Sequence, residues 1–357
     1  MNNKVLMSGN EAIARGAIDA GCRFYAGYPI TPQNELTAYM ALHMPQEGGV
    51  FIQAESELAA INMVYGASAA GARAMTSSSS PGISLKQEGI SYIAGARLPA
   101  VIVNMMRGGP GLGNIWPAQS DYFQATRGGG HGDYRCIVLA PSTVQEAYGF
   151  TRFAFSAADQ YRNPVIILGD GMLGQMMEPL QLSDKALLKT ENRQLKTKKW
   201  ALTGCKGRKP NIVKSFYMAE GDLEKANLAL QKKYRAIQEK EERFESIFLE
   251  DARVVLAAYG TMARIAKGAV VELRKRGKKA GLIRPITLWP FPRKAFQGLL
   301  RTHRRAKLLV VEMSYGQMVE DVKLALECKL PVEFLGRSGG GVPAEAEIIK
   351  EVNRLIR

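Results

Sequence analysis

Short apolar runs recur along the first half of the chain and are separated by longer stretches with helical spacing. The runs cover residues 23–26, 50–54, 74–77, 100–105, 137–140 and 165–168. Apolar runs that alternate with helical patterns are typical of a parallel sheet with crossover helices. Ser8 and Glu11 have the S-x-x-E spacing of a capping box, so the first helix is expected to begin there and to stop at Gly21. The pattern predicts one doubly wound α/β domain over residues 1–184.

The pattern changes after residue 184. Between 222 and 248, apolar residues recur at three-, four- or seven-residue spacing, which indicates one amphipathic helix. Strand-like runs return at 254–259, 280–284, 307–312 and 331–335, with a helix that ends near Arg276. We therefore expect a helical insert over 185–250 and a smaller second α/β domain over 251–357.

The charge of the chain is strongly positive and unevenly distributed. The formal net charge is +15, and the segment 185–250 carries 16 Lys and Arg against 9 Asp and Glu. Such an excess fits nucleic acid, phosphate-bearing ligands or an acidic protein surface. The segment lacks the interleaved aromatics of a single-strand binder, and the sequence shows no helix-turn-helix or zinc-finger pattern. We interpret the segment as a basic docking surface; a non-catalytic scaffold or nucleic-acid-binding protein remains an alternative of a different class.

Cysteine usage and hydropathy exclude several classes of protein. Cys22, Cys136, Cys205 and Cys328 are far apart and form no CxxC pair, so neither zinc nor an iron–sulfur cluster is expected on this chain alone. No stretch approaches the roughly 20 apolar residues that span a bilayer, and the N-terminal residues lack the pattern of a signal peptide. We expect a cytoplasmic protein that does not enter a membrane.

Three polar residues follow strand-like runs and form a candidate site. In GYPITPQNE, Pro29 and Pro32 fix the backbone on either side of Ile30 and Thr31, which predicts a rigid elbow rather than a strand. Glu55 and Arg107 follow two further runs. Ligands of open parallel sheets bind beyond the carboxyl ends of the strands, so Thr31, Glu55 and Arg107 are expected to converge on one crevice.

Glu55 and Arg107 also have simpler explanations when each is taken alone. A carboxylate at position 55 complements the dipole of the helix that follows, and Arg107 fits a residue that caps a helix or strand end. The helix after Glu55 is rich in Ala and Gly, which predicts a close helix interface with Glu55 at its rim.

Two tempting motifs are incomplete. Gly169, Asp170 and Gly171 begin like the GDG…N motif that holds Mg²⁺ and the diphosphate of thiamine enzymes, but no asparagine follows at the usual distance. The glycines of GGPGLG and GGGHGD do not fit GxGxxG. We interpret His131 as a loop histidine rather than a catalytic base, with a supporting role near a ligand as the alternative.

Long stretches of the chain resemble a known family. They are GYPITP, QAESELAAINMVYGASAAGARAMTSSSSPGISLKQEGIS, MMRGGPGLGN, QSDYFQATRGGGHGDYR, RPITLWPFP and VEMSYGQM. Together they resemble the alpha-type subunit of 2-oxoacid:ferredoxin oxidoreductases, most closely the 3-methyl-2-oxobutanoate (2-ketoisovalerate) branch. The resemblance implies a thiamine diphosphate pyrimidine-binding domain over 1–184 and a transketolase C-terminal-like domain over 251–357.

The resemblance also implies an activity and a set of partners. The expected reaction is the coenzyme A-dependent oxidative decarboxylation of a branched-chain 2-oxoacid to acyl-CoA and CO₂, with reduction of ferredoxin; 2-oxoglutarate and pyruvate are the alternative substrates. A beta-type subunit would hold the Mg²⁺-diphosphate end of a shared thiamine diphosphate. A gamma-type subunit would help to complete the coenzyme A site, and a ferredoxin-like subunit would carry the [4Fe-4S] clusters. No metal ligand and no nucleic acid are assigned to this chain.

Carried over by this resemblance, Glu55 is the glutamate that faces the pyrimidine N1′, and Pro29 is a second cofactor-binding residue. Thr31 and Arg107 correspond to groups that bind the carbonyl and carboxylate of the oxoacid. The side chains of Ile30, Met105, Met106 and Leu112 suggest an apolar wall suited to a branched side chain. 2-Oxoglutarate would need a second cation, for which the sequence offers no clear candidate.

Overall fold

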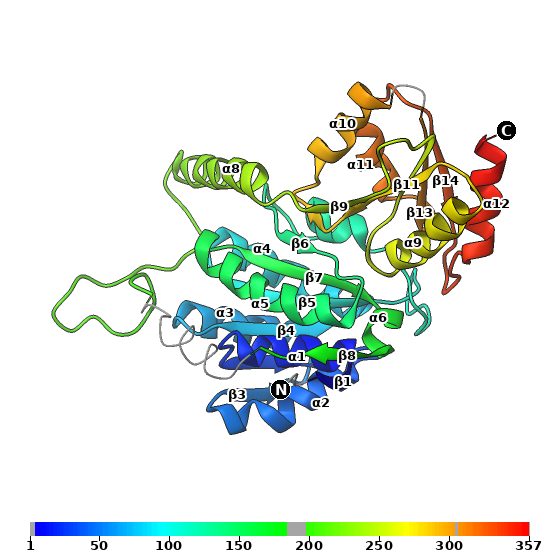
Figure 1. Cartoon of the computed structure of the whole chain (residues 1–357). Coiled ribbons are helices and arrows are strands. Elements are labelled where there is room, and N and C mark those ends of the chain that lie inside the picture. Colours follow the sequence, from blue (N-terminus) through cyan, green and yellow to red (C-terminus); the bar gives the residue numbers. More distant parts are fainter. Residues whose placement is uncertain (1–3, 184–197, 304–305, 357) are drawn as a thin grey trace.

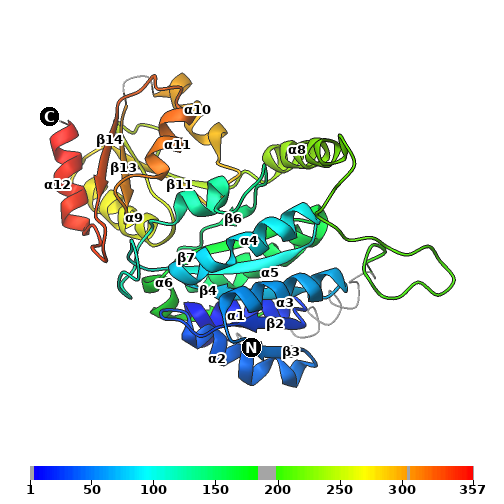
Figure 2. The same cartoon turned by 180° about the vertical axis from the view of Figure 1, so that it is seen from behind.

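The computed structural model describes residues 4–183, 198–303 and 306–356. Its larger sheet has seven strands in the order β12-β6-β7-β5-β4-β2-β3, in which β12 is Thr287–Trp289 (Figures 1 and 2). Six of them are the predicted runs, and they pair in parallel: β2 (Phe24–Gly27), β3 (Val50–Gln53), β4 (Ala74–Ser78), β5 (Ala100–Met106), β6 (Ile137–Leu139) and β7 (Pro164–Asp170). The predicted α/β class with a doubly wound parallel sheet is confirmed.

Helices cover both faces of this sheet, as crossover connections require. On one face lie α1 (Gly9–Asp19), α2 (Asn34–His43) and α5 (Val144–Tyr161); on the other lie α3 (Glu57–Ala69) and α4 (Ser80–Gly95) (Figures 1 and 2). The capping box of α1 is confirmed, because the Ser8 hydroxyl accepts from the Glu11 amide while Glu11 accepts from the Ser8 amide. Gly21 follows the helix with a positive φ of 76°.

A second sheet has five strands in the order β14-β13-β10-β11-β9. The predicted strands correspond to β10 (Val254–Ala257), β11 (Ala280–Pro285), β13 (Lys307–Glu312) and β14 (Val332–Gly336), which pair in parallel. They are accompanied by α9 (Gly260–Lys275), α10 (Arg293–Thr302), α11 (Met318–Ala325) and α12 (Glu345–Ile356). None of the helices within the described residues is both long enough and apolar enough to cross a bilayer.

The predicted helix over 222–248 is wrong at its C-terminal end. The helix α8 (Asp222–Lys240) is amphipathic as expected and buries Ala226, Leu230, Tyr234 and Ile237. Phe244 instead lies on β9 (Phe244–Ile247), which pairs antiparallel with β11. Helical spacing of the apolar residues continues past Lys240, but pairing with a strand distant in the sequence determines the backbone there.

Other strands also depend on partners far away in the chain. The strand β1 (Lys4–Ser8) pairs antiparallel with β8 (Met177–Gln181), and β12 (Thr287–Trp289) pairs with β6 of the larger sheet. The chain beyond residue 251 therefore contributes a strand to the first sheet. The expected boundary at 184/185 lies outside the described residues, and the division into 1–184, 185–250 and 251–357 stays a prediction.

Buried polar contacts join the two sheets. The Gln119 side chain donates to the Tyr259 carbonyl at 2.9 Å and accepts from the Met313 amide at 3.0 Å. The buried guanidinium of Arg284 on β11 donates to Glu146 on α5 at 2.8 Å. Such buried contacts fix the second sheet relative to the first, because breaking them would leave polar groups unsatisfied.

The helix α8 contains a lysine whose charge is disfavoured by its surroundings. Lys233 donates to the Arg162 carbonyl at 3.1 Å, and its ammonium lies 5.3 Å from the centre of the Tyr234 ring. Burial, assisted by the positive charges of Arg97 and Arg162, lowers the pKa of Lys233 to about 7.

This shift predicts a pH-dependent stability. Between pH 7 and 9 the folded chain loses the Lys233 proton while the unfolded chain keeps it, so the unfolding free energy should rise with pH by up to about 1 kcal/mol per unit. Urea unfolding of the wild type and of Lys233→Met at pH 7 and pH 9 measures the difference. Lys232→Met, at the exposed neighbouring position, is the matched control; equal pH dependence in all three proteins would contradict the prediction.

Candidate functional site

The predicted elbow connects β2 to α2 and lies outside any strand. Pro29 is exposed at its tip, whereas Ile30 and Thr31 are half-buried. The buried Gln33 stabilises the turn: its backbone amide donates to the Ile30 carbonyl at 3.0 Å, and its side chain donates to the Tyr28 carbonyl at 3.3 Å. Hydrogen bonds from the buried Gln33 therefore fix the backbone of the segment that contains Thr31.

Arg107 follows β5 directly and bridges two loops at the carboxyl edge of the sheet. Its side chain is buried, with 7% exposed. Nη1 donates to the Thr31 carbonyl and Nη2 to the Leu112 carbonyl, both at 3.0 Å. The structure thus brings the elbow and Arg107 together, as expected from the strand order. Within the described part of the chain, the buried Nε atom of Arg107 has no hydrogen-bond partner, so its N–H can donate to a further group.

Two glutamates occupy the turn between β3 and α3, in very different surroundings. Glu55 is exposed, and Ser56 caps α3 by accepting from the Ala59 amide at 3.1 Å. Glu57 is the first residue of the helix and is 5% exposed. The Ser78 hydroxyl donates to its Oε1 at 3.4 Å.

The Glu57 carboxylate also lies directly against Gly82, where any side chain at position 82 would collide with it. Gly82 belongs to the first turn of α4, which begins just after β4. The sequence pattern singled out Glu55 and missed Glu57. The sequence contained one indication of this difference, the capping serine Ser56 between the two glutamates. The residues before and after an N-cap have different backbone conformations, so their side chains point in different directions.

The expected apolar wall is only partly present. Met105 and Met106 belong to the hydrophobic core. The sulfur and methyl group of Met105 pack against Gly169, and its methyl group also packs against Gly174, so its assignment to a substrate wall is wrong. Alternation along β5 directs this side chain into the helix layer. Leu112 is 80% exposed on the glycine-rich loop, and Ile30 remains half-buried on the elbow.

The glycine-rich loop after Arg107 meets the second half of the chain. Gly113 has a positive φ of 62°, and a side chain there would overlap the Gly108 carbonyl. The Asn114 side chain donates to the Gly339 carbonyl at 3.0 Å, and Trp116 packs on Gly340. The loop that Arg107 stabilises therefore lies where the two α/β units approach one another.

Asp170 is used inside the fold. At the end of β7 its Oδ1 accepts from the amides of Met172 and Leu173, at 3.0 and 3.1 Å, and caps the short helix α6 (Gly171–Gln175). Burial raises the pKa of this carboxyl group. Over residues 4–183, 198–303 and 306–356, no group of three or more His, Cys, Asp and Glu side chains is arranged to hold a metal ion.

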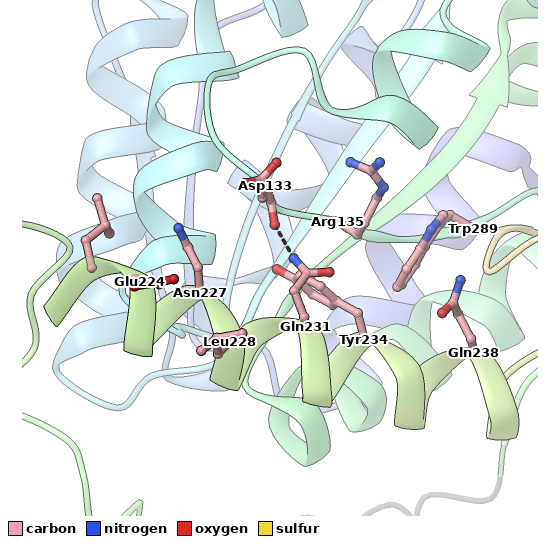
Figure 3. Close-up of a pocket in the computed structure, with 10 residues that line it drawn as sticks. Asp133, Arg135, Glu224, Asn227, Leu228, Gln231, Tyr234, Gln238 and Trp289 are labelled. Carbon is pink, nitrogen blue, oxygen red and sulfur yellow. Dashed lines mark hydrogen bonds between the residues drawn. The ribbon is translucent and has the colours of Figure 1, made fainter. Parts of the chain in front are cut away.

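A pocket of about 660 Å³ lies elsewhere, between α8 and residues 133–135 (Figure 3). Gln231 of α8 donates to the Asp133 carbonyl at 2.9 Å beside it. None of the residues predicted for the site lines this pocket. His131 lies on the exposed loop just before residues 133–135, and its ring contacts Tyr92 edge to face. This position agrees with a loop histidine.

Comparison with known families decides the identity of this arrangement. Residues 15–243 match the family model described as "Pyruvate flavodoxin/ferredoxin oxidoreductase, thiamine diP-bdg". Residues 252–348 match "Pyruvate:ferredoxin oxidoreductase core domain II". The chain belongs to the 2-oxoacid:ferredoxin oxidoreductase family. The family resemblance seen in the sequence is confirmed, and the chain is a subunit of an oxidoreductase rather than a scaffold.

Individual members of the family are similar over their whole length. The ketoisovalerate oxidoreductase subunit VorB of Methanothermobacter marburgensis is 50% identical over 98% of this chain and 97% of its own. The 2-oxoglutarate synthase subunit KorA of Archaeoglobus fulgidus is 40% identical over 93% of this chain and 94% of its own.

Solved structures show the same fold. The 2-oxoglutarate:ferredoxin oxidoreductase of Magnetococcus marinus, solved with 2-oxoglutarate, coenzyme A and succinyl-CoA, superposes with a TM-score of 0.86 at 26% identity. The match covers all of this chain and 66% of that longer chain. A split-gene transketolase, at 12% identity and a TM-score of 0.57, shares the fold alone.

Proposed function

We propose that this chain forms the substrate-facing half of a thiamine diphosphate site in a complex that converts 3-methyl-2-oxobutanoate to its acyl-CoA and CO₂ and reduces ferredoxin. The observation that carries the proposal is the contact between Arg107 and Thr31 beside the Glu55–Glu57 turn, at the carboxyl edge of one parallel sheet. Ketoisovalerate subunits at 50% and 48% identity support the branched-chain substrate.

The residues at this edge fit the pyrimidine end of the cofactor. When bound, thiamine diphosphate supplies a carbon nucleophile for the oxoacid carbonyl and takes up the electrons left by loss of CO₂. A carboxylate that faces N1′ controls the protonation of the ring. Glu55, with Pro29 as a second contact, stays the prediction from sequence. Burial of Glu57 against Gly82 makes it the stronger candidate, because a hydrogen bond shielded from water is electrostatically stronger.

Thr31 and Arg107 are suited to the oxoacid itself. The guanidinium keeps Nε free and is attached to the elbow, so a carboxylate bound to Arg107 would lie close to Thr31. Ile30 is expected to contact the side chain of the substrate. 2-Oxoglutarate remains an alternative substrate, because the 2-oxoglutarate synthase subunits KorA are 36–40% identical to this chain. Pyruvate is the second alternative.

The partner subunits are expected at two surfaces. Leu58, Asn62 and Gly66 on α3, and Ala70 directly after it, are exposed at four-residue spacing, so this face is open to the beta-type subunit that brings Mg²⁺ and the diphosphate site. Residues 198–221, the described part of the basic segment before α8, form a loop that projects from the body and exposes Ile212, Phe216 and Met218 (Figure 1). We propose that it docks on the gamma-type or the ferredoxin-like subunit, whose [4Fe-4S] clusters receive the electrons, in the cytoplasm.

The proposal is tested by titrating Mg²⁺ and thiamine diphosphate into the isolated chain by calorimetry, and again after the beta-type subunit is added. We expect micromolar binding only with both subunits present, because Asp170 is used as a helix cap and the described residues contain no group of three or more His, Cys, Asp and Glu side chains that could hold Mg²⁺. The fully reconstituted complex should then prefer 3-methyl-2-oxobutanoate over 2-oxoglutarate and pyruvate in kcat/KM. Micromolar binding by the isolated chain would overturn the shared site, and preference for another oxoacid would overturn the substrate.

A further inference from the structure

Lys86 on α4 is completely buried, with 0% of its surface exposed. Lysine is almost never buried in this way unless it is paired. Its ammonium donates to the Thr76 hydroxyl at 2.8 Å and to the Ser77 carbonyl at 3.0 Å, both on β4. Burial lowers the pKa of Lys86 to about 7, so the fold keeps the amine here against a considerable desolvation cost.

The carboxylate whose negative charge acts on Lys86 is Glu57. Lys86 lies one helical turn after Gly82, and residues four apart share one face of a helix. The absent side chain of Gly82 makes the space that the Glu57 carboxylate fills. The negative charge of Glu57 opposes the effect of burial on the pKa of Lys86. Both groups therefore lie beneath the carboxyl end of β4.

A second set of buried groups leads from Lys86 to the elbow. The backbone carbonyl of Ser77 accepts from Lys86. The hydroxyl of Ser77 donates to the Gln33 side chain at 2.6 Å. Thr37 donates to the same Gln33 oxygen at 3.0 Å, and the Tyr25 hydroxyl lies 2.6 Å from that of Ser77. Gln33 in turn holds the Tyr28 carbonyl at the start of the elbow.

We propose that Lys86 is a positioning residue for the reaction: it orients the Glu57 carboxylate and, through Ser77 and Gln33, fixes the elbow that carries Thr31. This inference rests on the proposed role of Glu57 at the cofactor. A buried ammonium ion suits this task because its hydrogen bonds to β4 fix its position, and its positive charge then favours one position of the nearby carboxylate.

The first test is Lys86→Met in the reconstituted complex, with Lys86→Gln as a second variant that keeps hydrogen-bond donors but loses the charge. We expect kcat to fall by at least about tenfold in both, on the scale of a misplaced catalytic group. KM for 3-methyl-2-oxobutanoate should rise by a smaller factor than kcat falls, because neither change removes a side chain that is proposed to contact the substrate. Lys233→Met, which removes a second lysine whose pKa is also about 7, should leave both constants unchanged.

The second test needs no cofactor. Thermal unfolding of the full chain is measured for Lys86→Met, Glu57→Gln and the double variant. Because the first change removes the positive charge that acts on the buried Glu57 carboxylate, the double variant should melt at a higher temperature than Lys86→Met alone. Additive losses in melting temperature would show that the two groups are not coupled, and would overturn the inference.

The outcomes separate this inference from the proposed function. If Lys86→Met and Lys86→Gln turn over normally while Glu57→Gln is inactive, the role of Lys86 is wrong and that of Glu57 stands. If Glu57→Gln is fully active, the proposed role of Glu57 at the cofactor is wrong, and the role of Lys86 that rests on it is wrong as well. Should Lys86→Met not fold, Lys86→Gln decides the kinetic test alone.

Discussion

Glu57→Gln in the reconstituted complex is expected to lower turnover by at least about a hundredfold while leaving assembly intact. Proton control at N1′ is general acid–base chemistry, and losing such a group typically costs two to four orders of magnitude. Glutamine has nearly the same shape and can still accept from Ser78, so the packing against Gly82 should survive. The measurement is the steady-state rate of dye reduction at saturating oxoacid and cofactor, with assembly checked by gel filtration.

Glu55→Gln is the matched variant, two residues away on the same turn. The sequence-based prediction assigns the hundredfold loss to Glu55, whereas the burial of Glu57 predicts a small effect at position 55. A large loss for Glu55→Gln together with normal turnover of Glu57→Gln would favour the first assignment. Normal turnover of both variants would remove this turn from the mechanism.

Arg107→Leu is expected to lower kcat/KM by about a hundredfold or more for 3-methyl-2-oxobutanoate, 2-oxoglutarate and pyruvate alike, because all three share the carboxylate that this guanidinium is proposed to bind. The same guanidinium holds the carbonyls of Thr31 and Leu112, so the loss combines a missing contact with a displaced elbow. Initial rates with each oxoacid, at several concentrations, measure the effect.

Arg107→Lys and Ile30→Ala are the comparisons for this residue. Lysine keeps the charge but cannot donate to both carbonyls in the fork geometry of arginine, so most of the loss should remain. Ile30→Ala should mainly change the preference among oxoacids, since Ile30 is proposed to contact the substrate side chain. If Arg107→Leu changed only that preference and spared overall efficiency, its assignment to the carboxylate would be wrong.

Much of the candidate site could be predicted because it depends on where strands end. The predicted runs at 23–26 and 100–105 coincide with β2 and β5 to within one residue at each end. The carboxyl ends of parallel strands share one edge of a sheet. The position of Thr31 beside Arg107 followed from this rule. The depth to which each side chain is buried did not follow from it, so the burial of Glu57 was not predicted and Met105 was assigned to the wrong layer.

The sequence by itself determined the local elements of this protein, its family and the order of its two α/β units, because apolar runs, caps and prolines act over a few residues. Tertiary structure alone decided the features that depend on distant partners. Pairing with β11 makes a strand of Phe244 although its spacing is helical, and pairing with β6 places β12 in the first sheet. Burial of Lys86 and Glu57 depends on the approach of α3 to α4 at Gly82, a contact that no local pattern encodes.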